Sequence, residues 1–183
     1  WQWRRLGEKQ VLIRTIAERT AQAPHPLPAQ DGWGALDPGL IAYQPVTATG
    51  VFDHDREAHV FFALAKPKNG ISGPGYLVIT PLVLASGGTV LVNRGFVPAE
   101  RKSPASRLAG QMTGSMAITG LMRPPEMRGA FAGADDPAKN IFYVRDPKAI
   151  AAAKGLAGVA PMLIDLQAPL PDGGLPMPGA TQI

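Results

Sequence analysis

The sequence contains no cysteine, no long apolar run and none of the common catalytic signatures. Without cysteine among its 183 residues, the chain has no disulfide, no thiolate metal site and no thiol nucleophile. No stretch approaches the roughly 20 apolar residues of a membrane-spanning helix. The best run, 76–85, is too short and contains Pro81. These absences exclude a disulfide scaffold, a cysteine enzyme and a spanning helix within the printed sequence.

Catalytic motifs are missing as well. There is no Gly-x-Ser-x-Gly, phosphate loop, dinucleotide fingerprint or HExxH pattern. The three histidines, His25, His54 and His59, show no metal-ligand spacing, and the acidic pairs near 53–55 and 135–136 lie in turns. We therefore expect no metal site and no enzyme. A hydrolase would require a Ser or Thr within hydrogen-bond reach of one of these histidines.

The charge pattern also excludes some partners. The net charge is +4, but the basic residues are scattered and have no interleaved aromatics, so we expect no nucleic-acid binding. At the start, Trp1 and Trp3 stand beside Arg4, Arg5 and Lys9, a pattern typical of a helix that leaves a bilayer. An ordinary amphipathic helix packed on a sheet gives the same pattern. Since the chain begins without Met, we expect further segments on both sides.

Glycine and proline together make 40 of the 183 residues, which favours a mainly β, α+β domain over a helical bundle. Apolar residues at helical spacing predict a helix from residue 1 to about 22, ended by Pro24. A proline-rich, irregular connection follows to residue 42. Period-two patterns then predict a hairpin made by 43–52 and 59–65, a long flexible connection over 66–75, and a second hairpin of 76–85 and 89–97 around a Ser-Gly-Gly turn.

The second half predicts fewer elements. We expect a short helix near 104–108, strands at 115–122, 141–145 and 161–167, and a helix over 147–154 with Asp146 as its N-cap and Gly155 at its end. The tally is about seven mostly antiparallel strands in a curled sheet or barrel, with a helix in front and one late helix. The predicted organisation is 1–42 helix and connection, 43–167 β-rich domain, and 168–183 Pro/Gly-rich tail.

One arginine interrupts an otherwise apolar strand. Arg94 shares a strand face with Val92 and Phe96, whereas Asn93 and Gly95 point to the other face. In one interpretation Arg94 reaches a carboxylate or propionate of a ligand at the barrel rim. In the other it forms an internal salt bridge to one of the chain's acids, with Asn93 and Gly95 making a bulge.

The order of these pieces resembles the surfeit locus protein 1 (Surf/Shy) family. The resemblance covers residues 1 to about 125 well and weakens onward. The matching pieces are Trp1-Gln2 with Arg4, Arg5 and Lys9; Tyr43 through Val46 to Gly50 and Phe52; Gly75-Tyr76 with Thr80-Pro81-Leu82; Val90 to Pro98 with its Asn93-Arg94-Gly95; Gly120 through Arg123-Pro124; and, loosely, Asn140, Phe142 and Asp146.

The resemblance implies a non-enzymatic assembly factor for cytochrome c oxidase that assists formation of the haem a site in the core subunit. It implies a membrane protein of the respiratory chain, with one membrane helix before Trp1 and one after Ile183. The β-domain would lie on the extracytoplasmic side of a bacterial inner or mitochondrial inner membrane. Haem a is the candidate cofactor, attributed to the membrane part, and no family haem motif matches the three histidines. Tyr76, Asn93, Arg94 and Gly95 are the candidate functional or structural residues. The alternative is a small-molecule or cofactor-binding barrel.

Overall fold

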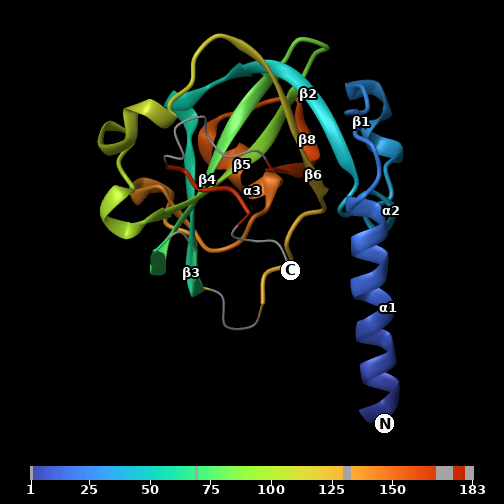
Figure 1. The fold of residues 1–183 in the computed structure, drawn as a ribbon. Helices are drawn as coiled ribbons and strands as arrows, with labels where there is room; N and C mark the ends of the chain where they lie inside the picture. Colours follow the sequence, from blue (N-terminus) through green and yellow to red (C-terminus); the bar gives the residue numbers. More distant parts are fainter. Residues whose placement is uncertain (1, 69, 130–132, 168–174, 180–183) are drawn as a thin grey trace.

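Five strands of the chain hydrogen-bond in a ring and form a barrel-like closed sheet, seen in a computed structural model that describes residues 2–68, 70–129, 133–167 and 175–179 (Figure 1). The ring runs β2, β6, β8, β5 and β4, and β4 pairs back with β2. The bounds of these strands are β2 Pro45–Phe52, β4 Ile71–Leu84, β5 Thr89–Pro98, β6 Ser115–Arg123 and β8 Val159–Leu166. The prediction of a mainly β domain with a curled, barrel-like sheet is confirmed.

A glycine allows the ring to close. Gly50 of β2 lies opposite Leu84 of β4, and a Cβ at Gly50 would collide with the backbone carbonyl of Val83. Only a residue without a side chain therefore permits the two strands to meet at this point.

Most neighbouring strands are antiparallel, and β5 with β8 is the parallel pair inside the ring. Outside it, β3 (Ala58–Lys68) pairs with β4, and two short strands pair in parallel fashion, β1 (His25–Pro26) with β2 and β7 (Ile141–Phe142) with β3. The described part of the chain thus has eight strands, one more than the sequence predicts, because the two-residue β1 is too short to leave a periodic pattern.

The predicted hairpin of 43–52 with 59–65 is wrong. In the structure β2 pairs with β4 and β6, and β3 pairs with β4 instead. The predicted flexible connection over 66–75 is wrong as well, since β3 runs to Lys68 and β4 begins at Ile71. Period-two patterns identify strands but not partners. The prolines and glycines of this stretch are tolerated because it forms the outer end of a hairpin.

Two apolar clusters lie on the two faces of the closed sheet, and the first of them fills its interior. One gathers the inward side chains at the β2–β6 side, and its buried members include Val46, Leu82, Val92, Met122 and Ile164. The other packs β3, β4 and β5 against the late helix, and its members include Leu77, Ile79, Leu91, Phe96 and Ile150. These side chains are almost completely buried, so the strands enclose a packed core rather than a wide ligand cavity.

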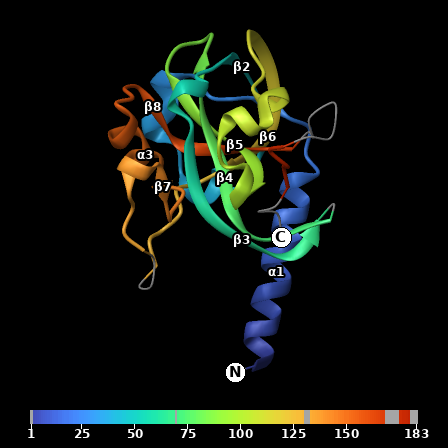
Figure 2. The ribbon, with the colours of Figure 1, turned by 90° about the vertical axis from the view of Figure 1, so that its left-hand side faces the viewer.

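Three helices and five 3-10 turns complete the described chain. The first helix, α1 (Gln2–Thr20), stands beside the barrel and carries its N-terminal end far from it (Figures 1 and 2). The second, α2 (Pro38–Ile41), is a single turn in the proline-rich connection. The third, α3 (Pro147–Lys154), has the predicted bounds, with the Asp146 side chain accepting from the Lys148 amide as N-cap. The 3-10 turns are η1 Gln30–Ala35, η2 His54–Arg56, η3 Ala99–Arg101, η4 Pro104–Gly110 and η5 Pro137–Lys139.

The predicted tail at 168–183 is only partly covered, because 168–174 and 180–183 lie outside the described residues. Within 175–179, Met177 is buried and exchanges backbone hydrogen bonds with Phe96 of β5. No helix in the described ranges is long and apolar enough to cross a membrane.

Candidate functional site

Arg94 enters the core through a bulge in β5. The pairing between β4 and β5 places Val78 opposite Gly95 and Ile79 opposite Asn93, so Arg94 is the extra residue with no partner. A bulge of this kind frees one residue from the ladder and redirects its side chain. Arg94 is consequently buried, with 4% of its surface exposed, rather than placed at a solvent-facing rim.

Each of the three guanidinium nitrogens of Arg94 donates a hydrogen bond. Nε donates to the Thr80 hydroxyl at 2.8 Å and Nη1 to the carbonyl of Gly110 at 2.6 Å. Nη2 donates to Oε1 of Glu57 and to Oε1 of Gln111, both at 2.8 Å. Of the two interpretations of Arg94, the internal salt bridge is the one that the structure contains, and its acid is Glu57.

A second arginine binds the same carboxylate. Arg107, in η4, donates from Nη2 to Oε2 of Glu57 at 2.8 Å and to the carbonyl of Lys102 at 2.9 Å. Its Nε donates to the carbonyl of Arg101 at 2.9 Å. One buried carboxylate therefore lies between two buried guanidinium groups. The loop between β5 and β6 is fastened to the barrel by the pair of Arg107 with Glu57 and by the Gly110 carbonyl, which accepts from Arg94.

His59 and Asn140 complete the group, which we call the Glu57 cluster: Glu57, His59, Arg94, Arg107 and Asn140. The Asn140 amide nitrogen donates to the carbonyl of Glu57 at 2.7 Å and to Nδ1 of His59 at 3.2 Å. Since Nδ1 accepts a hydrogen bond, the proton of a neutral His59 lies on Nε2, which donates to Oε2 of Glu57 at 2.7 Å. The cluster ties η5 to the start of β3.

The electrostatics of the Glu57 cluster follow from this crowding. Burial alone would raise the pKa of Glu57, but hydrogen bonds from His59 and Arg107 outweigh it and lower the pKa to about 2. Burial lowers the pKa of Arg94 to about 10, against the opposing attraction of Glu57, so Arg94 stays charged at neutral pH. The cluster therefore sets two buried guanidinium groups against one carboxylate.

The four sequence-predicted residues fall into two groups. Tyr76 lies beside the Glu57 cluster, where its ring meets His59 edge-on at 6.1 Å and Lys102 Nζ lies 4.9 Å from its ring centroid. Asn93 and Gly95 point to the opposite face of β5 from Arg94. There Asn93 donates to Asp165 of β8 at 3.1 Å and accepts from the Gly95 amide at 3.1 Å. Asp165 also pairs with Arg123 at 2.9 Å.

Sequence reasoning missed Glu57, the acid that pairs with Arg94, and Arg107, the second arginine on the same carboxylate. Glu57 ends a run of polar turn residues, and Arg107 lies in a polar loop. The signal in the sequence was indirect. An arginine in an apolar strand calls for a partner such as a buried acid, and Glu57 directly precedes strand β3.

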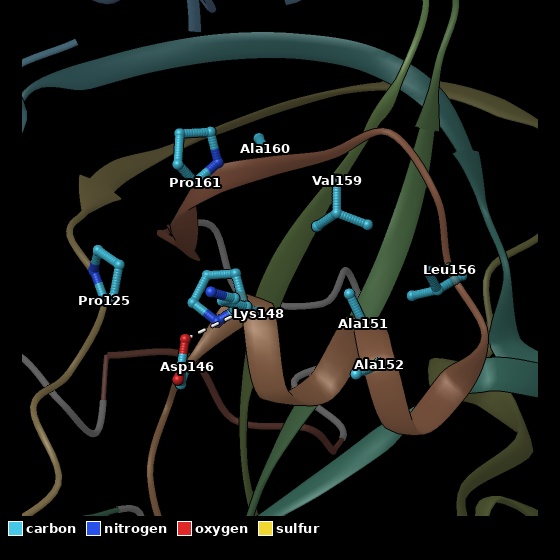
Figure 3. A pocket seen from close by; sticks show the side chains of 10 residues that line it. Pro125, Asp146, Lys148, Ala151, Ala152, Leu156, Val159, Ala160 and Pro161 are labelled. Atoms are coloured by element: carbon cyan, nitrogen blue, oxygen red, sulfur yellow. Dashed lines mark hydrogen bonds between the residues drawn. The ribbon is translucent and has the colours of Figure 1, made fainter. Parts of the chain in front are cut away.

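Two neighbouring hollows lie on the surface near α3, away from the Glu57 cluster. The larger encloses about 620 Å³ and is mostly apolar, with Pro125, Ala151, Leu156, Val159 and Pro161 among its lining residues (Figure 3). The smaller encloses about 200 Å³, shares Pro125 with it, and is lined by both apolar and charged residues. There Arg123 is paired with Asp165 and Arg145 with Glu126, at 2.9 and 3.0 Å. Because each arginine already has a carboxylate, these hollows present no net positive site for an anion.

Comparisons with known proteins now decide the family. The profile of the SURF1 family matches residues 1–183. The chain belongs to the SURF1 family. It is 34% identical over 195 residues to the SURF1-like protein of Monosiga brevicollis, covering 100% of this chain and 70% of that protein. Surfeit locus protein 1 of Xenopus tropicalis is 31% identical over 194 residues and that of Homo sapiens 32% over 196 residues, each along 100% of this chain.

The match covers only part of the length of these vertebrate family members. The chain spans 61% of the length of the frog protein and 62% of the human protein. The family resemblance proposed from the motifs is therefore confirmed for the chain, while the activity of a whole family protein remains to be proposed.

The family raises the question of whether this chain could hold a haem. His25 Nε2 lies 3.0 Å from the Gln44 side-chain oxygen, His54 Nε2 lies 2.6 Å from the carbonyl of Met112, and His59 is buried in the Glu57 cluster. No histidine is among the described residues that line the hollows near α3 or along α1. A haem requires an open ligand beside a cavity. These hollows of the described residues therefore offer no histidine ligand to a haem.

Proposed function

We propose that this SURF1 family chain is the extracytoplasmic domain of an assembly factor for cytochrome c oxidase, and that it is not an enzyme. The observation that carries the proposal is the family match along the whole chain. The ordered motif set from Trp1 to Pro124 supports it, since that set is the one shared with an oxidase-assembly family. In this role the domain binds a newly made core subunit while its haem a site forms.

The Glu57 cluster supports a binding role rather than a catalytic one. Glu57, Arg94 and Arg107 are each at least 96% buried and bind one another, so they hold the loop and the barrel together rather than facing a substrate. A rigid surface made of loops on a barrel is what a docking module needs. We propose that Arg94, Asn93, Gly95 and Tyr76 serve assembly by fixing that surface.

We further propose that haem a is handled outside the described residues. Because no histidine lines the described hollows near α3 or along α1, the cofactor would be contacted by membrane helices that flank the domain or by the oxidase subunit itself. We also propose that the domain lies on the extracytoplasmic side of a bacterial or mitochondrial inner membrane.

A second candidate function is a small-molecule barrel without an oxidase role. The apolar hollow of about 620 Å³ beside α3 favours it. The filled interior opposes it, because Val46, Leu82 and Val92 occupy the space enclosed by the strands. Binding of a soluble apolar ligand at the α3 hollow, together with normal oxidase content in a deletion strain, would favour this alternative.

Two experiments test the proposed function. In the source organism, deletion of the full-length gene is expected to lower the haem a absorbance and the activity of the oxidase, and full-length protein is expected to restore both. Normal oxidase in the deletion strain would refute the assembly role. In a separate absorbance titration, haem a is expected to bind the full-length protein and not the 183-residue chain. Binding of haem a to the 183-residue chain would show that the β-domain itself holds the cofactor.

A further inference from the structure

The helix α1 carries a heptad seam. Six of its positions are spaced alternately by three and four residues, which places them on one narrow stripe of the helix. The seam consists of Trp3, Leu6, Gln10, Ile13, Ala17 and Thr20. This spacing is that of the a and d positions through which two helices pack against each other.

The seam is largely uncovered in this chain. Trp3 is 87% exposed, and Leu6 and Ile13 are each about half exposed. Ile13, Ala17 and Thr20 also line an open hollow of about 370 Å³ along the helix. The helix is held at its other side, where Arg19 donates to the carbonyls of Gly39 and Ala42 at 2.8 and 3.0 Å. Its N-terminal half stands clear of the barrel in both ribbon views (Figures 1 and 2).

The charges that flank the seam are of one sign. At roughly 100° per residue, Lys9 borders the seam on one side and Arg14 on the other. The acidic residues lie elsewhere, with Glu8 on the far face paired to Arg4 at 3.3 Å. A partner helix that packs on the seam would therefore place its own flanking residues against cations.

A second copy of this chain does not fit that pattern. In a parallel pair, Lys9 of one helix would face Arg14 of the other, because flanking residues five positions apart meet across the seam. In an antiparallel pair, both Lys9 side chains would lie along one edge of the interface and both Arg14 side chains along the other edge. Either arrangement gathers like charges along the interface with no acid to offset them, which disfavours the pair.

A membrane surface fits less well than a helix. A helix that lies flat in a bilayer interface presents a broad apolar face. Here the stripe is interrupted near its middle by Gln10, a polar residue of the kind that sets register when it lies at a heptad core position. Ile16 borders the stripe on one side and lines the same hollow, whereas Val11 lies well away from it.

We propose that the seam of α1 docks a helix of a partner protein whose apolar heptad positions are flanked by aspartate or glutamate. This inference deepens the proposed assembly function and rests on it, since it names the surface by which the domain would hold a partner. The binding test below contains no oxidase, so its failure is distinguishable from failure of the assembly role in the deletion strain.

The test uses two designed helical peptides of about three heptads with the same Leu/Ile seam. One carries Glu at its flanking positions and the other carries Lys. Fluorescence anisotropy of each labelled peptide is measured as the 183-residue chain is added. We expect the Glu peptide to bind roughly tenfold or more tightly than the Lys peptide, and the preference to shrink at about 1 M salt. Equal binding of the two peptides, or no binding of either, overturns the proposal.

Matched variants locate the binding to the seam. Leu6→Asp is expected to weaken the Glu peptide roughly tenfold or more. Val11→Asp, an equally exposed apolar position outside the seam, is expected to leave binding unchanged. The double variant Lys9→Glu with Arg14→Glu is expected to prefer the Lys peptide. Circular dichroism of each variant confirms that α1 remains helical.

Two other occupants would overturn the proposal if found. Sedimentation of the chain alone detects self-association, and a dimer that Leu6→Asp dissolves would assign the seam to a second copy. Co-sedimentation with vesicles of phosphatidylcholine and phosphatidylserine detects a lipid surface. Vesicle binding that Leu6→Asp abolishes, in the absence of any peptide preference, would assign the seam to the membrane.

Discussion

Nη2 of Arg94 lies 2.8 Å from Oε1 of Glu57, and this ion pair joins the middle of β5 to the residue that precedes β3. The same carboxylate binds Arg107 from the loop after β5. Three segments that are distant in sequence therefore share one buried negative charge. Removing that charge leaves two guanidinium groups buried without a counter-ion, which is far more costly than losing a surface pair.

Glu57→Gln is expected to lower the free energy of unfolding by about 3–5 kcal/mol, because it leaves Arg94 and Arg107 uncompensated. Urea unfolding followed by circular dichroism measures the change. Glu8→Gln is the matched control, since it breaks the exposed pair with Arg4 and is expected to cost less than about 1 kcal/mol. A Glu57→Gln variant as stable as the control would show that the cluster contributes little to the fold.

The same carboxylate predicts a pH dependence. The pKa of Glu57 is about 2 in the folded chain against an ordinary value of 4.5. A depressed acid pKa stabilises the fold above the unfolded value, and this contribution is lost as pH falls from about 4.5 through 2. The pKa difference corresponds to about 3 kcal/mol. Unfolding free energies measured from about pH 5 to 2 are expected to fall more steeply in the wild-type chain than in Glu57→Gln. Parallel profiles would contradict the low pKa.

The sequence predicted elements better than partners. The caps of α3 are local, so Asp146 and Gly155 fixed its bounds correctly. The partner of β2 is not local. A polar turn at 53–57 indicated a hairpin, yet the chain turns through η2 and β3 joins the outer side of β4. Nothing in a period-two pattern distinguishes these two pairings.

The sequence predicted the candidate site only in part. The interrupted apolar strand identified Arg94 and raised the bulge, because both are properties of one strand. The sequence could not identify Glu57 as the buried acid, because that depends on how the segments of Glu57 and Arg107 pack against β5 in the folded chain. Two of the three contributing segments read as polar loops, and polar loops are ordinarily solvent-exposed.

Arg94→Lys is expected to destabilise the chain by about 2 kcal/mol or more, although it keeps the charge. A lysine ammonium cannot span Thr80, Gly110, Glu57 and Gln111, which the planar guanidinium reaches together. We expect hydrogen exchange to accelerate across the loop 99–111, and oxidase assembly by the full-length variant to decline in proportion to lost stability. Arg94→Ala is expected to cost more. A variant that folds normally and supports full oxidase assembly would show that the Arg94 contacts are dispensable.

Gly95→Ala is expected to detach the segment around Met177 from β5. Gly95 has a φ of +128°, which L side chains rarely adopt, and a Cβ there would collide with the Met177 backbone carbonyl. The variant therefore suffers both backbone strain and loss of the hydrogen bonds between Phe96 and Met177. Gly114→Ala is the matched control, because its φ of +82° carries the strain but no atom lies within 4 Å of the new Cβ. We expect Gly114→Ala to cost about 1 kcal/mol and Gly95→Ala to cost clearly more. Hydrogen exchange at the Met177 amide is expected to accelerate only in Gly95→Ala. Equal exchange and equal stability of the two variants would show that the 175–179 segment can move away from β5 without loss of stability.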